Sequence, residues 1–432
     1  MRVLVYCYGS RGDVEPYLAL AHALDRSGHT AVLVAPRLFR PFAEAYGVDF
    51  APLDDWAVRV WERPDVRQLR WTSDRRSPET ERLRESLRDE AKRNYPAVLD
   101  DMWAAAADGA DLIVHSQASR EQIAQIAERL GVPNVLGVLY PNFVISREYP
   151  AFGRLSDVFS DQEDLRGTDP RSYIAPDLIE TIAQWRRTTL QLPPREDFLD
   201  FRHRADGSPT PVLHCFSPHV IKPASDWADW VHTPGFWHLP PAPGWRPPAE
   251  LTEFLEAGSK PLFVGFGSTM SPDPRATAEI VLEGVRRSGH RALVVEGWGG
   301  IEVTGRSEDV LSVRDVPYAW LLPRVRAAVH AGGPGTYNAA LRAGIPQVIC
   351  SFETSQKMWG DHLHRLGVAP APTMQRDLTA EGLAADIGQA VTDPATATAT
   401  ARLRAALATE DWSTDAVAVL EKIRAQGVGG GR

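Results

Sequence analysis

A chain of 432 residues is too long for one ordinary domain, so two domains with separate hydrophobic cores are expected. Hydrophobic residues make up 44% of the chain and charged residues 24%, which is typical of a soluble globular protein. The net charge of -9 argues against a nucleic-acid-binding protein, because binding to a phosphate backbone needs a basic surface.

Cysteine content and hydropathy restrict the class of protein further. Cys7, Cys215 and Cys350 are too few and too widely separated for a disulfide framework or a zinc site. No apolar run approaches the roughly 20 residues that span a bilayer, so no transmembrane segment is expected. The chain opens on an apolar strand, VLVYCY, without a signal-peptide pattern. A cytoplasmic protein is therefore expected.

The first part of the chain has the pattern strand, loop, helix, strand. The strand is predicted over residues 2–8, the helix over 14–26 and the next strand over 30–35, with Pro16 in the first helical turn, where proline is tolerated. Further strands are predicted over 111–116, 135–139 and 211–216. Aromatic-rich insertions at 55–100 and 140–205 interrupt this pattern. Loops at such places can line an apolar acceptor pocket, and the alternative is that each aromatic residue packs in the core.

The same pattern returns in the second half of the chain. A strand is predicted over 261–266, a helix over 277–287 and a strand over 291–296. The tetrapeptide Arg-Ser-Gly-His at 26–29 recurs at 287–290, each time between helix and strand, and Gly-Ser at 9–10 recurs at 267–268. Two copies of a βαβ unit predict an α/β fold with two tandem Rossmann-like, doubly wound parallel-sheet domains that face a cleft. The first domain is expected over 1–218, a stiff proline-rich linker over 219–250, and the second domain over 251–411.

A glycine-rich turn lies between two predicted strands of the second domain. The sequence HAGGPGT follows an apolar strand and opens a helix that ends near Gly344. A helix that begins in such a turn leaves several N–H groups unpaired, which suits the binding of phosphate. His330, Gly332, Gly333, Gly335 and Thr336 are the candidate residues. The alternative is a tight turn with structural glycines, in which His330 is a core histidine.

These motifs resemble those of GT-B glycosyltransferases, most closely the family 1 branch that decorates bacterial glycopeptide, macrolide and polyketide antibiotics. GSRGDVEP at 9–16 resembles the N-terminal loop of that branch, and PLFVGFGS at 261–268 resembles the first strand and loop of its donor domain. Residues 330–336 align with the family's His-His-Gly-Gly-Ala-Gly-Thr. The resemblance implies an amphipathic C-terminal helix, about 412–426, that packs back on the first domain.

The resemblance also implies a reaction. It predicts an inverting, metal-independent transfer of a sugar from a dTDP- or UDP-sugar to a hydroxyl of a hydrophobic small molecule, in antibiotic biosynthesis. No cofactor is expected besides the nucleotide-sugar co-substrate, and a homodimer is left open. The chain has no Asp-x-Asp pair for a metal and no Gly-x-Gly-x-x-Gly for a dinucleotide. A nucleotide-sugar epimerase and a non-catalytic NDP-sugar-binding auxiliary protein are the alternatives with the same fold.

Asp13 is the residue that the resemblance implies as catalytic base, and His330 is expected to act with it on the diphosphate side. A helix N-cap is the alternative role for Asp13, and N–H groups that bond a carboxylate weaken it as a base. The reserve bases are His115, which ends the strand DLIVHS, and His22, which lies in the first helix.

The remaining site residues are expected to bind the donor. Ser10 and Ser268 are predicted to contact the diphosphate, whereas the Val316 backbone and Trp298 are predicted to contact the pyrimidine. Ser355 and Gln356 occupy the place of the family's Asp-Gln pair, which holds donor-sugar hydroxyls. Since Ser355 replaces the acidic member, a deoxysugar or aminosugar donor is favoured over glucose. The resemblance favours deoxythymidine over uridine donors.

Overall fold

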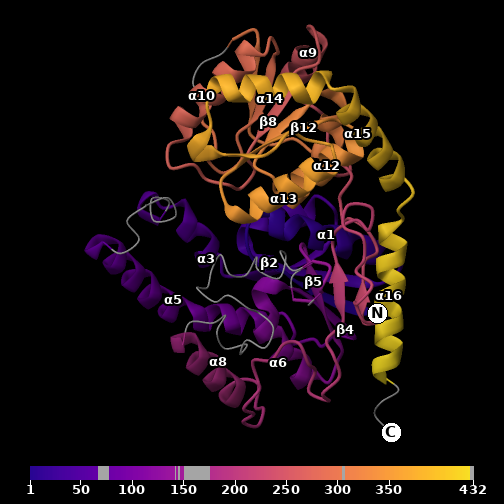
Figure 1. Cartoon of the computed structure of the whole chain (residues 1–432). Helices are drawn as coiled ribbons and strands as arrows, with labels where there is room; N and C mark the ends of the chain where they lie inside the picture. Colours follow the sequence, from indigo (N-terminus) through magenta and orange to yellow (C-terminus); the bar gives the residue numbers. More distant parts are fainter. Residues whose placement is uncertain (67–76, 142, 145, 150–175, 304–306, 429–432) are drawn as a thin grey trace. The chain divides into compact units, whose positions relative to one another are not determined.

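The computed structural model describes residues 1–66, 77–141, 143–144, 146–149, 176–303 and 307–428, and it divides the chain into two compact units. Unit 1 comprises Met1–Trp237 and Asp411–Arg432, and unit 2 comprises His238–Glu410. Each unit holds its own parallel sheet (Figure 1). The predicted fold class, two doubly wound α/β domains in tandem, is thus confirmed.

Unit 1 contains a seven-stranded sheet in the order β3-β2-β1-β4-β5-β6-β7, with every neighbouring pair parallel. Its strand order reverses between β1 and β4, and loops that follow strands at such a point form the ligand crevice of doubly wound sheets. The strands are β1 (Arg2–Tyr6), β2 (Thr30–Pro36), β3 (Asp49–Leu53), β4 (Leu112–Ser116), β5 (Asn134–Val138), β6 (Val212–His214) and β7 (Val231–His232). Its principal helices are α1 (Arg11–Arg26), α2 (Arg40–Glu44), α3 (Trp56–Arg59), α5 (Pro78–Ala104), α6 (Arg120–Leu130), α8 (Pro176–Thr188) and α16 (Trp412–Val428).

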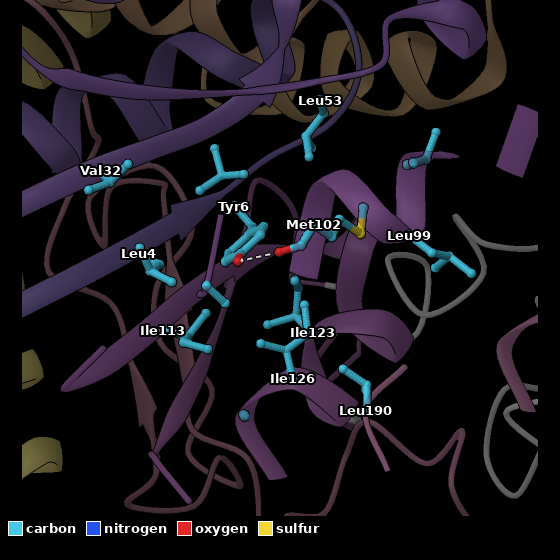
Figure 2. Packing of buried hydrophobic residues seen from close by; sticks show 14 of the residues in the cluster. Leu4, Tyr6, Val32, Leu53, Leu99, Met102, Ile113, Ile123, Ile126 and Leu190 are labelled. Atoms are coloured by element: carbon cyan, nitrogen blue, oxygen red, sulfur yellow. Dashed lines mark hydrogen bonds between the residues drawn. The ribbon is translucent and has the colours of Figure 1, made fainter. Parts of the chain in front are cut away.

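The core on one face of this sheet is drawn in Figure 2. Leu4 and Tyr6 of β1 pack with Ile113 of β4 and with Ile123 and Ile126 of α6, all of them buried. The hydroxyl of Tyr6 would be costly to bury without a partner, and it donates a hydrogen bond to the Met102 carbonyl of α5 at 2.8 Å. Parallel strands that are apolar on both faces need such a helical layer.

Unit 2 contains a six-stranded sheet in the order β10-β9-β8-β11-β12-β13. Numbered from its own first strand, this order matches the first six strands of unit 1, which agrees with the predicted repeat. The strands are β8 (Leu262–Gly265), β9 (Ala292–Val295), β10 (Val310–Val313), β11 (Ala328–His330), β12 (Gln347–Ser351) and β13 (Thr373–Met374). The helices are α9 (Ala249–Glu256), α10 (Pro274–Arg287), α11 (Tyr318–Leu321), α12 (Pro334–Ala343), α13 (Thr354–Arg365), α14 (Ala380–Thr392) and α15 (Pro394–Leu407).

The predicted linker over 219–250 is wrong. Residues up to Trp237 belong to unit 1, where they supply β7 and the buried side chains of Ile221, Phe236 and Trp237. The last part of the predicted linker carries the first residues of α9 in unit 2. Prolines are frequent in this segment, but the large apolar residues between them pack into the core of unit 1, and proline does not prevent this in an extended backbone.

The C-terminal segment returns to unit 1. Helix α16 packs against α1, and it buries Ala416, Val417, Leu420 and Ile423. Trp412 stacks on Trp237 with ring centroids 6.3 Å apart. No helix in the described part of the chain is long and apolar enough to cross a bilayer.

Candidate functional site

The glycine turn of unit 2 lies at the point where the order of its strands reverses. It follows β11, whose neighbour β8 carries the loop with Ser268. Gly333 is the N-cap of α12, and Pro334 takes the first helical position, where a missing N–H costs no hydrogen bond. The expected helix therefore forms, and it begins at Pro334.

The N–H groups of the turn are not all open to a ligand. The Gly332 N–H donates to His330 Nδ1 at 3.0 Å, and those of Thr336 and Tyr337 donate to the Gly333 carbonyl. The N–H groups of Gly333 and Gly335 have no acceptor within the described part of the chain. A Cβ on either of these two residues would meet no atom within 4 Å. Among the glycine amides of the turn, those of Gly333 and Gly335 are thus open, whereas the prediction had named the Gly332 amide as well.

His330 lies beneath the turn rather than in it. Its ring is fully buried, Nε2 bonds Gln347 Oε1 at 2.8 Å, and Nδ1 accepts from Gly332. Burial lowers the pKa of His330 to about 4, so the ring is neutral at pH 7. The expectation that His330 acts directly on the diphosphate does not fit this geometry, because both ring nitrogens bond within the protein.

Two further loops of unit 2 meet beside the turn. The loop after β8 carries Ser268, and the loop after β9 carries Trp298, whose N–H donates to the Gly267 carbonyl at 3.0 Å. Ser268 and Trp298 are both half-buried. Val316, which follows β10, has its side chain buried in the unit 2 core, so its main chain is the part that can contact a base.

Gln356 is already engaged in the structure. Its Oε1 accepts from the N–H groups of Phe352 at 2.8 Å and Glu353 at 3.3 Å, and its Nε2 donates to Thr269 Oγ1 at 2.9 Å. Glu353 is the N-cap of α13, and Gln356 completes a capping box with it. Gln356 Oε1 therefore cannot accept a further hydrogen bond from a sugar hydroxyl. Its Nε2 carries a second proton that can still be donated. Ser355 is half-buried beside it.

The predicted donor-binding residues of unit 2 lie along the sheet in the order base, diphosphate and sugar, which is the order of these parts in a nucleotide sugar. The pyrimidine candidates follow β10 and β9, the diphosphate candidates follow β8 and β11, and the sugar candidates follow β12. Neighbouring strands are about 4.8 Å apart, so this edge spans about 19 Å from β10 to β12. All five loops lie at the carboxyl ends of parallel strands, which is one edge of the sheet.

Asp13 and Ser10 form the corresponding turn in unit 1. Helix α1 begins at Arg11 with Ser10 as its N-cap, so Asp13 is the third helical residue and not the N-cap that the alternative had assumed. Asp13 Oδ2 accepts from the Ser10 N–H at 2.8 Å and from Ser10 Oγ at 2.9 Å, as part of a capping box. This turn follows β1, next to the reversal of strand order in unit 1. Asp13 is partly exposed.

The two reserve bases differ from Asp13 in their surroundings. His115 is fully buried, Asn134 Nδ2 bonds its Nε2 at 3.2 Å, its Nδ1 contacts the Ser116 carbonyl, and burial lowers its pKa to about 4. His22 is nine residues beyond Asp13, about 13 Å along α1 toward the opposite end of the sheet, where it packs on Tyr46. The geometry thus favours Asp13 over both histidines.

The sequence-based prediction missed two polar residues that support the site. Thr269 holds Gln356, and Gln347 holds His330. Gln347 could have been noticed, since it is a polar residue that precedes the apolar run VIC in a predicted buried strand. Within the described residues, no group of three or more His, Cys, Asp or Glu side chains is placed to hold a metal ion.

Family models match both ends of the chain. Residues 3–125 match the glycosyltransferase family 28 N-terminal domain, and residues 302–423 match the C-terminal domain of erythromycin biosynthesis protein CIII-like proteins. The first match contains Ser10 and Asp13, and the second contains the glycine turn.

Curated relatives include glycosyltransferases of two kinds. The O-mycaminosyltylonolide 6-deoxyallosyltransferase of Streptomyces fradiae is 32% identical over 98% of this chain and 97% of its own length. Sterol 3-beta-glucosyltransferases of Leptosphaeria maculans and Arabidopsis thaliana are each 31% identical, over 85% and 90% of this chain. The chain spans only 25% and 62% of the length of these two relatives.

Solved structures share the fold. The calicheamicin glycosyltransferase CalG4 superposes with a TM-score of 0.68 at 16% identity, and 98% of each chain is covered. The glycosyltransferase SsfS6 of Streptomyces sp. SF2575, complexed with thymidine diphosphate, gives a TM-score of 0.61 at 20% identity, covering 98% of this chain and 99% of the other.

Proposed function

Since the chain belongs to the GT-B glycosyltransferases of natural-product biosynthesis, we propose that it transfers a deoxysugar, with inversion and without a metal, from a nucleoside diphosphate to a hydroxyl of a hydrophobic small molecule. The observation that carries the proposal is the order of the unit 2 loops along one sheet edge, which matches base, diphosphate and sugar. A dTDP donor is favoured because similar structures bind thymidine diphosphate, and UDP is the alternative.

The open amides of Gly333 and Gly335 are the proposed diphosphate ligands, together with the hydroxyls of Thr336 and Ser268. As the bond from the anomeric carbon to the diphosphate oxygen breaks, negative charge grows on the leaving group. The positive end of the α12 dipole stabilises this charge. Fixed amides need no reorganisation during the reaction, so they act more strongly in the transition state than mobile side chains would.

Asp13 is the proposed base. It removes the proton of the acceptor hydroxyl while that oxygen attacks the anomeric carbon from the face opposite to the diphosphate. Ser10, which holds the Asp13 carboxylate, is proposed to position it. For the pyrimidine we propose the Val316 main chain and Trp298, and for the sugar Ser355 and the remaining Nε2–H of Gln356.

The sugar site favours a donor with few hydroxyls. Gln356 Oε1 is taken up by two amides, and Ser355 stands in place of a carboxylate, so the site has little capacity to accept hydrogen bonds from a sugar. A buried hydroxyl without an acceptor is costly. A deoxysugar avoids that cost, which supports the deoxysugar proposal over glucose.

The test combines nucleotide binding with turnover. The protein is incubated with dTDP- and UDP-sugars and a panel of macrolactone, polyketide and sterol acceptors, and release of the nucleoside diphosphate is followed. We expect dTDP to bind and its release to require acceptor. Conversion of the donor sugar without acceptor and without net release of nucleoside diphosphate would favour an epimerase, and binding without turnover would favour an auxiliary protein. Absence of both binding and release would refute the proposal.

A further inference from the structure

Gln347 is a buried polar residue at the start of β12. Its side chain is fully buried in a strand that continues with Val348, Ile349 and Cys350, and its Nε2 has no hydrogen-bond partner among the described residues, so burying this amide is costly. Its Oε1 lies 2.8 Å from His330 Nε2. Parallel pairing of β11 and β12 brings the two side chains together, with Ala328 opposite Gln347 and His330 opposite Ile349.

The two hydrogen bonds of His330 determine where its proton lies. The Gly332 N–H can only donate, so Nδ1 is the acceptor and carries no proton. A neutral imidazole then carries its proton on Nε2, which donates to Gln347 Oε1. The acceptor oxygen of Gln347 thus favours the Nε2–H tautomer of His330. In this tautomer Nδ1 can accept a hydrogen bond from the Gly332 N–H.

Gly332 is the residue through which this pair reaches the turn. Its φ of +95° lies in the region that favours glycine, and a Cβ there would approach the Gln356 carbonyl oxygen to 2.9 Å. The Gly332 N–H is therefore held by His330, and the main chain of α13 leaves no room for a Cβ on Gly332. The next residue is Gly333, whose amide and that of Gly335 have no acceptor in the part of the chain that the structure describes.

We propose that Gln347 is a positioning residue of the diphosphate site, acting through His330 on Gly332 so that the Gly333 and Gly335 amides point at the leaving group. This inference rests on the proposed function. It assigns His330 a role behind the turn as a neutral acceptor. Gly333 and Gly335 then contact the diphosphate, whereas Gln347 and His330 act on it only through the backbone of Gly332.

The experiment compares variants that differ in their hydrogen-bonding atoms and little in volume. Gln347→Met removes the acceptor, and His330→Asn keeps an acceptor oxygen near the position of Nδ1, whereas His330→Leu does not. Ser351→Ala is the matched control, because Ser351 is a buried polar residue on the same strand and face. The dissociation constant for dTDP is measured by calorimetry, and thermal unfolding shows that each variant is folded.

We expect Gln347→Met and His330→Leu to weaken dTDP binding about tenfold or more, and His330→Asn and Ser351→Ala to stay within about threefold of the wild type. In ¹⁵N spectra of histidine-labelled protein without nucleotide, His330 should show a protonated Nε2 in the wild type and a changed tautomer ratio in Gln347→Met. An Nδ1–H tautomer in the wild type would overturn the inference, whether or not dTDP binds. Equal dTDP affinity of folded Gln347→Met and wild type would also overturn it. Failure of the wild type to bind any nucleoside diphosphate counts against the proposed function, and the tautomer then decides the inference alone.

Discussion

At the scale of single residues, Asp13 has two roles that oppose each other. Its Oδ2 accepts two hydrogen bonds from Ser10, which stabilise the charged carboxylate and so weaken it as a base. Asp13→Asn keeps an oxygen for the Ser10 N–H and removes the base. We expect kcat to fall about 100-fold or more, while the dissociation constant for dTDP stays unchanged.

The control for that variant is Glu15→Gln, on the same turn of α1, where the carboxylate pairs with Arg11 at 2.9 Å near the surface. Steady-state kinetics with saturating donor measure both variants. If Asp13→Asn keeps the wild-type kcat, Asp13 is only part of the capping box. If both variants lose activity equally, the loss reflects the net charge of α1 and not a base.

Gly332 and Gly333 are neighbours, yet an alanine substitution should change the stability of the protein only at Gly332. Gly332→Ala places a Cβ at a φ of +95° and 2.9 Å from a main-chain oxygen, so we expect it to lower the free energy of unfolding by about 1–3 kcal/mol. Gly333→Ala has a φ of -67° and open space around the Cβ, so stability should be kept.

The proposed diphosphate site gives Gly333→Ala a different effect. Its methyl group would lie where the leaving group approaches the main chain, so we expect the dissociation constant for dTDP to rise about tenfold, at a cost of about 1.4 kcal/mol in binding. Urea denaturation and calorimetry separate the two quantities. A Gly333→Ala variant that binds dTDP like the wild type would argue that the diphosphate lies elsewhere.

At the scale of elements, α16 is held to unit 1 mainly by its apolar side. Trp412 is 6% exposed and stacks on Trp237, whereas Glu421 pairs with His29 in an exposed position. We expect Trp412→Ala to lower the free energy of unfolding of unit 1 by about 3–5 kcal/mol, because it removes a large buried side chain. Glu421→Gln should change it by less than about 0.5 kcal/mol.

Chemical denaturation of both variants measures this difference, with tryptophan fluorescence as the probe of unit 1. A small effect of Trp412→Ala would mean that α16 contributes little to the stability of unit 1. A large effect of Glu421→Gln would mean that the ion pair, and not the apolar side of α16, holds the helix.

At the scale of the whole molecule, three buried histidines predict how stability depends on pH. Burial lowers the pKa of His115 and His330 to about 4 and that of His214 to about 3, from 6.5. Between those values the unfolded chain binds protons that the folded chain does not, so stability falls as pH decreases from about 6.5 to 4. Protonation of each histidine in the unfolded chain should lower the free energy of unfolding by about 2–3 kcal/mol at pH 4.5.

His214→Phe isolates one of these contributions. The ring of His214 stacks on Phe216 with centroids 4.4 Å apart, so an aromatic replacement fits the surroundings, although it leaves Thr233 without its bond to Nδ1. We expect the variant to lose less stability than the wild type between pH 7 and 4.5. Urea denaturation at both pH values gives the difference, and parallel pH profiles would contradict the prediction.

Much of the fold was predictable from the sequence because it depends on local patterns. Apolar runs, glycine stops and the repeated Arg-Ser-Gly-His segment predicted two βαβ-based domains, and the observed strand orders agree. The proline-rich segment was misjudged, since the sequence does not show that Phe236 and Trp237 lie in the core of unit 1. Proline frequency describes backbone stiffness, whereas burial depends on what packs against the segment.

The sequence by itself determined which residues gather at the edge of each sheet, because loops that follow parallel strands necessarily lie at one end. Only the tertiary structure decided what those residues do there. His330 bonds Gln347, 17 positions away, and Gln356 bonds Thr269, 87 positions away. Such partners depend on which strands become neighbours, and a hydrogen bond made within the protein removes an atom from those that a ligand can use.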